Sequence, residues 1–393
     1  MMLAVWVPLL LPFLAAPPAR RLAEALPPRA AAWMLAGSAA VLAGGTLCSL
    51  GLLAADGLLQ LPPVAALGHL SLPWLTSAAP DAPFAAALAA LALLALGALA
   101  VRTARRRLRE LRTARAALPA HERRAAPYDE LRTEPFAGHP ADHADGHRTD
   151  RPGRAPSPAQ HSDMRPPGAS VRRSRTPARL TALLRPTARL RAADHPLTVL
   201  DDECADAFAL PGRLGRPGRP GEPGRIVVTS GMLRALTAPE RSALLAHERA
   251  HLTARHHLFL ALAEHAAGVH PALRPLRAPL GYHLERWADE VAAARVGDRA
   301  VTARAVGRAA LAASRSPWAA RPRLVPAAHS GPVPRRVAAL LQPRPATAPG
   351  TWRRAAAVAL AACLALSTAA TLQATADLHH TVEAAQHGSG AQR

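Results

Sequence analysis

The chain has 393 residues, of which 50% are hydrophobic but only 3% aromatic, and it carries a formal net charge of +21 at pH 7. All 48 basic residues are arginine, which indicates a bias toward GC-rich codons. Without an aromatic platform or a recognisable nucleic-acid-binding module, this charge does not predict a nucleic-acid partner. The three cysteines, Cys48, Cys204 and Cys363, are far apart, which argues against a disulfide framework and a thiolate metal site.

Apolar residues gather in four blocks that predict membrane spans. The blocks Ala31 to Ala55, Ala82 to Val101 and Ala355 to Ala374 are uncharged, and each reaches the roughly 20 helical residues that cross a hydrocarbon core. Met1 to Ala16 is shorter but also uncharged. Because it lacks the basic region of a signal peptide, it predicts an uncleaved first span.

The placement of arginine predicts the topology. Three arginines lie between Arg20 and Arg29 and six between Arg102 and Arg112, whereas the loop from Asp56 to Asp81 has none. Basic loops stay in the cytoplasm. The region from Arg102 to Arg354 is therefore predicted to be cytoplasmic, with both termini outside.

A long polar segment follows the apolar block Ala82 to Val101 and its arginines. From Pro119 to about Arg191 it is rich in Pro, Arg, Asp, His, Ser and Gly, which predicts a disordered linker. Within it, His139, His143 and His147 recur every four residues and could form a weak metal-binding tract. A solvated linker is favoured, because a Pro and a Gly interrupt any helix that would align them.

Two short strands are predicted next, Ala207 to Leu210 and Ile226 to Thr229. Between them, glycine recurs every third residue from Gly212 to Gly224, but these five triplets are too few for a stable triple helix. The insert is therefore predicted to lengthen a turn. If the strands form a sheet beside the helix that follows, one edge could bind an extended substrate through the backbone, with this turn bordering the cleft.

The helix that follows carries the strongest chemical motif. It is predicted to begin at the capping box Thr237-Ala238-Pro239-Glu240 and to continue without a breaker to Gly268. It contains His247-Glu248-Arg249-Ala250-His251, which is an HExxH pattern. Residues four apart share one helix face, so both imidazoles can bind one Zn²⁺ while Glu248 acts on water, as metal-assisted peptide hydrolysis requires.

In a chain with 18 histidines an HExxH motif can occur by chance, so a metal site also requires a third ligand from another element. The next helical stretch, Glu285-Arg286-Trp287-Ala288-Asp289, offers two carboxylates four residues apart. One of them can bind the metal while the other orients a ligand imidazole.

In this order the motifs resemble the membrane-bound gluzincin metallopeptidases, meaning the BlaR/MecR-type integral-membrane peptidases and, more widely, the HtpX-type and CAAX prenyl endopeptidases. The upstream stretch Asp206-Ala207-Phe208-Ala209 and the run from Arg225 to Leu233 also resemble the family's N-A-F-A and V-x-V-T-x-G-L-L. Asp206 replaces the family's Asn, which bears only on the hydrogen bonds at that corner.

The resemblance implies a role for each matching residue. His247, His251 and Glu285 would bind one zinc ion, Glu248 would be the general base, and Asp289 would orient a ligand imidazole. The segment His329 to Val337 resembles the wider family's H-P-x-x-x-x-R-I, with Ser330 in place of Pro and a spacing one residue longer. It implies a transition-state or substrate contact for His329, Arg335 or Arg336, the alternative being an ordinary exposed loop.

Together these features predict a mainly α, polytopic membrane protein with about four transmembrane helices and a cytoplasmic zincin-like α+β metallopeptidase domain. The predicted regions are a three-span membrane region (1–112), the linker (113–193), the zinc peptidase domain (194–342), a linker with the fourth span (343–375) and a short tail (376–393). This tail is too short for the penicillin-binding sensor domain of the β-lactam receptors.

The predicted function is zinc-dependent cleavage of protein or peptide substrates at the cytoplasmic face of the cell membrane, with the lipid bilayer as the other partner. Regulated proteolysis of a repressor and HtpX-like quality control of membrane proteins are the two enzymatic alternatives. A non-catalytic signal transducer with a structural zinc is less favoured, because structural zinc sites are usually closed by four protein ligands. The sequence leaves the oligomeric state open.

Overall fold

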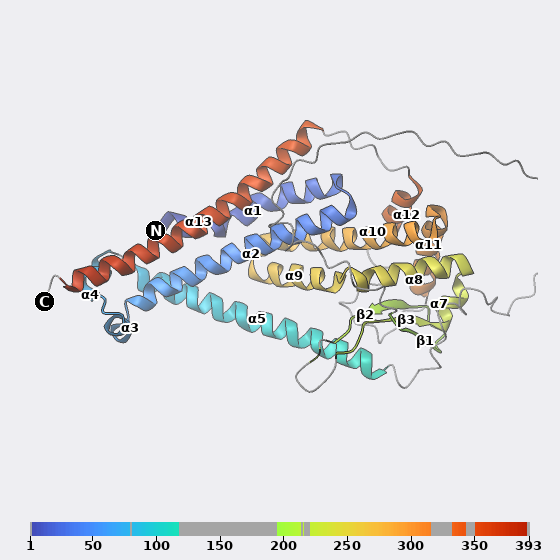
Figure 1. Cartoon of the computed structure of the whole chain (residues 1–393), viewed down its shortest axis with the longest axis horizontal. Coiled ribbons are helices and arrows are strands. Elements are labelled where there is room, and N and C mark those ends of the chain that lie inside the picture. The colour runs from blue at the N-terminus through green and yellow to red at the C-terminus, as the bar shows by residue number, and fades with distance from the viewer. Residues whose placement is uncertain are drawn as a thin grey trace, which may run out of the picture. The chain divides into compact units, whose positions relative to one another are not determined.

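The computed structural model describes residues 2–78, 81–117, 195–213, 215, 221–315, 332–342 and 350–390 (Figure 1). These residues are mainly helical and include one small sheet. The predicted linker with His139, His143 and His147 lies outside the described residues, and so does His329. The elements in chain order are α1 (Met2–Ala25), α2 (Pro28–Leu59), α3 (Pro62–Leu67), α4 (Leu72–Ala78), α5 (Ala82–Ala117), β1 (Leu197–Leu200), β2 (Ala207–Leu210), β3 (Arg225–Thr229), α7 (Ser230–Ala235), α8 (Ala238–Thr253), α9 (His256–Val269), η1 (Pro271–Leu276), α10 (Arg277–Val296), α11 (Arg299–Arg315), α12 (Val333–Leu341) and α13 (Thr351–Gly390).

Three helices of the described chain are long and apolar enough to cross a membrane. They are α2, α5 and α13, with mean hydropathies of 1.7, 2.5 and 2.0 in their most apolar windows. Each contains one of the longer blocks predicted from the sequence. The predicted first span lies in α1, which is helical through its four prolines but is not among the three.

The long helices pack through small residues. A Cβ at Gly57 of α2 would collide with the Cβ of Ala86 on α5, so these two backbones approach closely. Gly45 of α2 lies against Ser367 of α13 in the same way. Close contact at small residues is the usual basis of helix association in membranes, where lipid removes the hydrophobic drive for helices to associate.

The sheet has the order β1-β3-β2, with β1 parallel and β2 antiparallel to β3. Both predicted strands are present as β2 and β3, whereas β1 was not predicted from the sequence. One face of the sheet, which includes Ala209, Ile226 and Val228, packs against Leu244 and Leu245 of α8. The other face is covered by the arginine-rich end of α5, where Ala114 contacts the cluster of Leu200, Phe208, Leu210 and Val227.

The glycine-rich insert connects β2 to β3, as predicted for a lengthened turn. Arg213 and Glu222 continue the antiparallel pairing through two backbone hydrogen bonds of 2.9 and 3.0 Å. Residues 214 and 216–220 lie outside the described part of the chain. Whether this turn borders a substrate cleft stays a prediction.

The prediction of one helix from Thr237 to Gly268 was wrong. α8 ends at Thr253, and Arg255 adopts a left-handed conformation with φ of 53° before α9 begins at His256. No Gly or Pro marks this break in the sequence. A left-handed non-glycine residue costs about 1 kcal/mol or more, so tertiary contacts on both sides must hold it.

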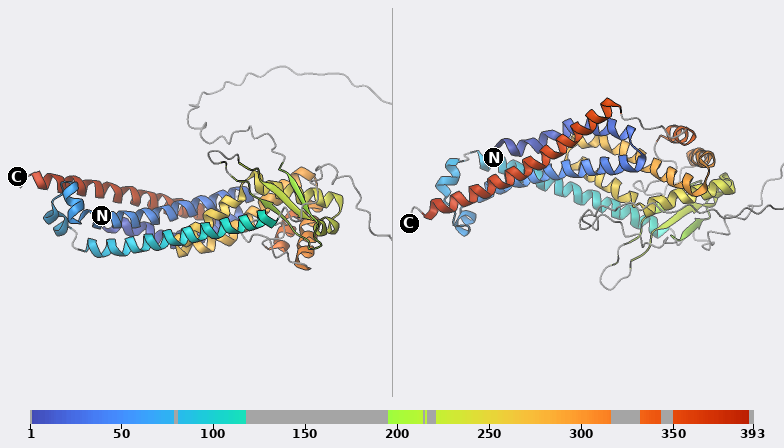
Figure 2. Two further views of the ribbon diagram at one scale, coloured as in Figure 1. Left: turned by 90° about the horizontal axis from the view of Figure 1, so that it is seen from below. Right: turned by 45° about the horizontal axis from the view of Figure 1, so that its top comes forward.

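α9 and α10 share one hydrophobic cluster with α1 and α2. The ribbons of these helices run alongside one another in both views of Figure 2. Phe259 of α9 and Leu280 and Leu284 of α10 are buried together with Leu35 and Leu42 of α2. Leu284 immediately precedes Glu285. The position of this carboxylate therefore depends on packing between α10 and α2.

The start of α8 is fixed by its capping box. The backbone N–H of Thr237 donates to Glu240 Oε2 at 3.0 Å, and the same oxygen lies 2.9 Å from Arg308 Nη1 of α11.

Glu240→Ala is expected to lower the free energy of unfolding by about 1 kcal/mol, because it removes this cap. Glu240→Gln should recover most of the loss, since an amide oxygen also accepts the Thr237 N–H and the pairs with half-exposed arginines contribute little. Urea unfolding of the two variants in detergent tests this order. Equal losses for Ala and Gln would assign the effect to charge rather than to capping.

Candidate metal centre

α8 and α10 bring three metal-binding side chains together. His247 Nε2 and His251 Nε2 are 3.1 Å apart, and Glu285 of α10 lies 3.5 Å from the first and 3.7 Å from the second through its two carboxylate oxygens. The three ligand atoms all lie within 4.8 Å of one another, and the three residues are buried. Two imidazoles and one carboxylate form the donor set of many catalytic zinc sites, so these residues fit a divalent metal ion.

Glu248 lies next to these ligands and is fully buried. Its negative charge helps to raise the pKa of Arg336, as the charges of Glu285 and Asp289 also do. Three buried carboxylates so close together need compensation by positive charge.

Asp289 contacts His247 on the side away from the ligand atoms. Its Oδ1 lies 3.0 Å from His247 Nδ1. Burial by itself would raise the pKa of Asp289, but hydrogen bonds and charge from Arg336 and His247 hold this pKa well below its usual range. An ionised Asp289 this close to Nδ1 favours the tautomer of His247 that carries its proton on Nδ1, and this tautomer would leave Nε2 to bind a metal ion.

Arg336 of α12 supplies the compensating charge. Its Nε and Nη2 donate to the two oxygens of Asp289 at 2.8 and 2.6 Å, and its Nη1 lies 3.0 Å from Glu285 Oε2. The side chain is fully buried. Burial opposes the charged form, yet the carboxylates of Glu285 and Asp289 keep the pKa of Arg336 above its usual value.

The predicted tail segment also offered Arg335 and His329 as contacts at the site. Arg335 is exposed, with its guanidinium 4.8 Å from the ring centre of Tyr282. His329 lies outside the described residues. Of the three, the described chain brings only Arg336 to the metal-binding group.

His256 is the site residue that the sequence analysis missed. The turn at Arg255 places its Nδ1 2.7 Å from His251 Nδ1, and its ring is fully buried with its centre 4.8 Å from that of Trp287. On one continuous helix, residues 251 and 256 would point in different directions, because five residues correspond to about 500° of rotation. No motif spacing could therefore have indicated this contact.

The contact between the two histidines determines their tautomers. If His251 Nε2 binds a metal, its Nδ1 carries the proton and donates it to His256 Nδ1, which must then be unprotonated. Burial lowers the pKa of His256 to about 3, so its imidazole is neutral and has one nitrogen available to accept. We therefore assign His256 the same orienting role for His251 that Asp289 has for His247.

His256→Leu is expected to weaken zinc binding about 10- to 100-fold, because His251 loses the acceptor that fixes its ring. His256→Asn should bind more tightly than His256→Leu, since its side-chain oxygen occupies the place of Nδ1. Competition with a fluorescent chelator measures both affinities. If the Leu and Asn variants bind zinc as tightly as the unaltered chain, His256 only fills space.

Asp206, which replaces the Asn of the family motif, takes part in several hydrogen bonds just before β2 begins. Its backbone N–H donates to Thr229 Oγ1 at 2.9 Å, and Thr229 Oγ1 donates to its carbonyl oxygen at 3.1 Å. Asp206 Oδ1 also accepts the N–H of Ala207 at 2.9 Å. The Asp therefore supports the turn that leads into the sheet.

A model of peptidase family M48 matches residues 175–274. The matched segment includes the sheet, α8 with His247, Glu248 and His251, and α9 with His256, and it ends before Glu285 and Asp289 of α10. Comparisons with curated proteins and with solved structures give no match. The match to peptidase family M48 supports a metallopeptidase.

Proposed function

We propose that this chain is a membrane-bound zinc endopeptidase of the BlaR/MecR-like type that cleaves protein substrates at the cytoplasmic face of the cell membrane. The convergence of His247, His251 and Glu285 with Glu248 beside them carries the proposal. The M48 match covers the helix that carries His247, Glu248 and His251, and it supports the metallopeptidase part of the proposal.

The side chains have complementary roles in the proposed reaction. His247, His251 and Glu285 would hold Zn²⁺, which supplies Lewis acidity toward the peptide carbonyl and lowers the pKa of water. Glu248 takes a proton from the attacking water and passes it to the leaving amine. Asp289 and His256 fix the two imidazole rings, and Arg336 keeps the carboxylates ionised by offsetting their charge.

The proposed orientation rests on the arginines of α5. The uncharged part of this helix ends at Val101, and the arginine-rich part continues to the sheet, where Arg115 Nη2 donates to the carbonyl oxygen of Pro211 at 2.7 Å. If the basic part of α5 faces the cytoplasm, the sheet and α8 lie on the same side. The edge strands β1 and β2 could there pair with an extended substrate.

Removal and return of the metal test the activity. The full chain in detergent should cleave an unfolded protein such as casein, lose this cleavage after treatment with a chelator, and regain it with one equivalent of Zn²⁺. Cleavage that persists in the chelated protein would contradict the proposal.

The nature of the substrate is a separate question. Proteins that accumulate in cells carrying Glu248→Gln would identify it. A soluble repressor among them supports regulated proteolysis, whereas damaged membrane proteins support HtpX-like quality control.

A further inference from the structure

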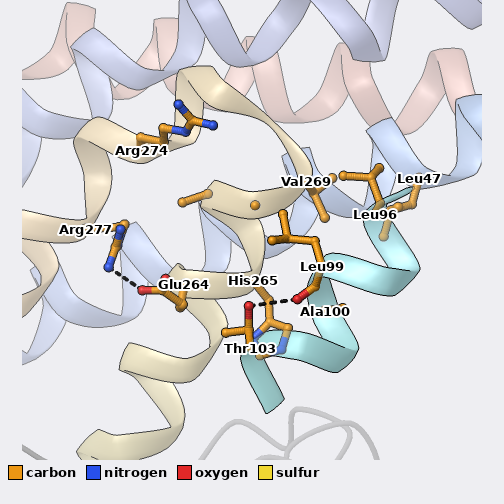
Figure 3. Close-up of a pocket in the computed structure, with 12 residues that line it drawn as sticks. Leu47, Leu96, Leu99, Ala100, Thr103, Glu264, His265, Val269, Arg274 and Arg277 are labelled. Carbon is orange, nitrogen blue, oxygen red and sulfur yellow. Dashed lines mark hydrogen bonds and ion pairs between the residues drawn. The ribbon is translucent and has the colours of Figure 1, made fainter. Parts of the chain in front are cut away.

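A cavity of about 340 Å³ lies between α5 and α9, separate from the metal-binding residues (Figure 3). Its walls also include Leu47 of α2 and residues of η1 and α10.

The two sides of the cavity differ in polarity. Leu47, Leu96 and Leu99 lie together on one side, and Arg274, Arg277 and Glu264 on the other, as Figure 3 shows. A ligand that fills this cavity must therefore have an apolar part and a polar part.

The polar side favours an anion. Arg277 forms an ion pair with Glu264, whereas Arg274 is exposed and has no ion-pair partner among the described residues. Arg107, one turn beyond Thr103 on α5, has Glu264, Glu110 and Arg277 as charged neighbours, and its Nε and Nη2 are buried without a hydrogen-bond partner in the described chain. Basic groups thus outnumber the acidic ones that could neutralise them.

The cavity also lies at the boundary between the apolar and basic parts of α5. Leu96 and Leu99 belong to the last turns of the uncharged stretch, and Thr103 follows Arg102, the first charged residue. In a membrane this is where acyl chains end and head groups begin. Basic pockets between transmembrane helices on the cytoplasmic side are suited to anionic lipid head groups.

We propose that this cavity binds one anionic phospholipid of the bilayer, with an acyl chain against Leu47, Leu96 and Leu99 and the head-group phosphate at Arg274. The exposed guanidinium of Arg274 is the group that meets the phosphate. The Arg277–Glu264 pair forms the wall beside it.

Native mass spectrometry of the delipidated full chain, titrated with phosphatidylglycerol or phosphatidylcholine, tests the proposal. One phosphatidylglycerol should bind more tightly than phosphatidylcholine. Arg274→Gln should weaken phosphatidylglycerol binding about fivefold, which corresponds to the loss of one arginine contact near an anionic head group. Leu96→Trp should weaken it as well by filling the apolar part.

Arg105→Gln is the matched control, because Arg105 is exposed on α5 and does not line the cavity. Thermal unfolding checks that all three variants remain folded. Equal binding of the two lipids, or equal effects of Arg274→Gln and Arg105→Gln, would overturn the proposal. Displacement of the bound lipid by millimolar inorganic phosphate would identify a site for a free anion instead.

Discussion

Arg336→Met is expected to lower the free energy of unfolding of the metal-free chain by about 3–5 kcal/mol. The guanidinium donates two hydrogen bonds to Asp289 and lies 3.0 Å from Glu285, and none of these three side chains is more than 4% exposed. Methionine retains much of the apolar volume but leaves both carboxylates without their compensating charge. Breaking a buried ion pair in this way costs far more than removing an exposed one.

Arg335→Met is the matched control, because the neighbouring arginine makes the same change in composition at an exposed position. It should change stability by less than about 1 kcal/mol. Denaturant unfolding of both variants in detergent, with and without Zn²⁺, measures the difference. The loss in Arg336→Met should be smaller with zinc, since the cation also neutralises Glu285. Equal stability of the two variants would show that Arg336 is not needed to compensate the buried carboxylates.

Helical periodicity accounts for most of what the sequence predicts about this site. The spacing of four residues places His247 beside His251 on α8 and Glu285 beside Asp289 on α10, whatever the surrounding fold. Uninterrupted apolar stretches likewise predict α2, α5 and α13, because length and composition are sufficient for a candidate span.

Contacts between distant segments account for what could not be predicted. The pairing of Arg336 with Asp289 joins residues 47 positions apart and depends on how α12 packs. The turn at Arg255 has no glycine or proline signal, yet it brings His256 to His251. β1 is only four residues long and follows a polar segment, so its own sequence gives no clear strand pattern. It is a strand because it pairs with β3.

Packing between the long helices and α10 also links the membrane region to the candidate metal centre. Leu280 and Leu284, which precede Glu285, are buried in one cluster with residues of α1 and α2. A fragment that lacks α1 and α2 would expose this face of α10. The experiments on metal binding and cleavage therefore require the full chain.

Glu248→Gln is expected to reduce peptide cleavage about 10²- to 10⁴-fold, the range over which a general base contributes to catalysis. Glutamine has nearly the same size and fits the fully buried position, but its amide cannot take a proton from water. Because Glu248 is not one of the three proposed ligands, the variant should still bind one zinc ion per chain. Cleavage of casein and metal content by elemental analysis are measured on the same preparation.

Glu240→Gln is the control for this variant, since it makes the same substitution at another buried position of α8, seven residues from His247 and engaged with Thr237 and Arg308. It should cleave casein at close to the rate of the unaltered chain. If Glu248→Gln and Glu240→Gln both bind zinc and cleave equally well, Glu248 is not the base, and the measured cleavage arises from another group or a contaminant. Zinc bound without any cleavage in the unaltered chain would instead favour the non-catalytic signal transducer, because the same three ligands can hold a metal without turnover. The pair of variants thus separates loss of the catalytic proton transfer from loss of charge on α8.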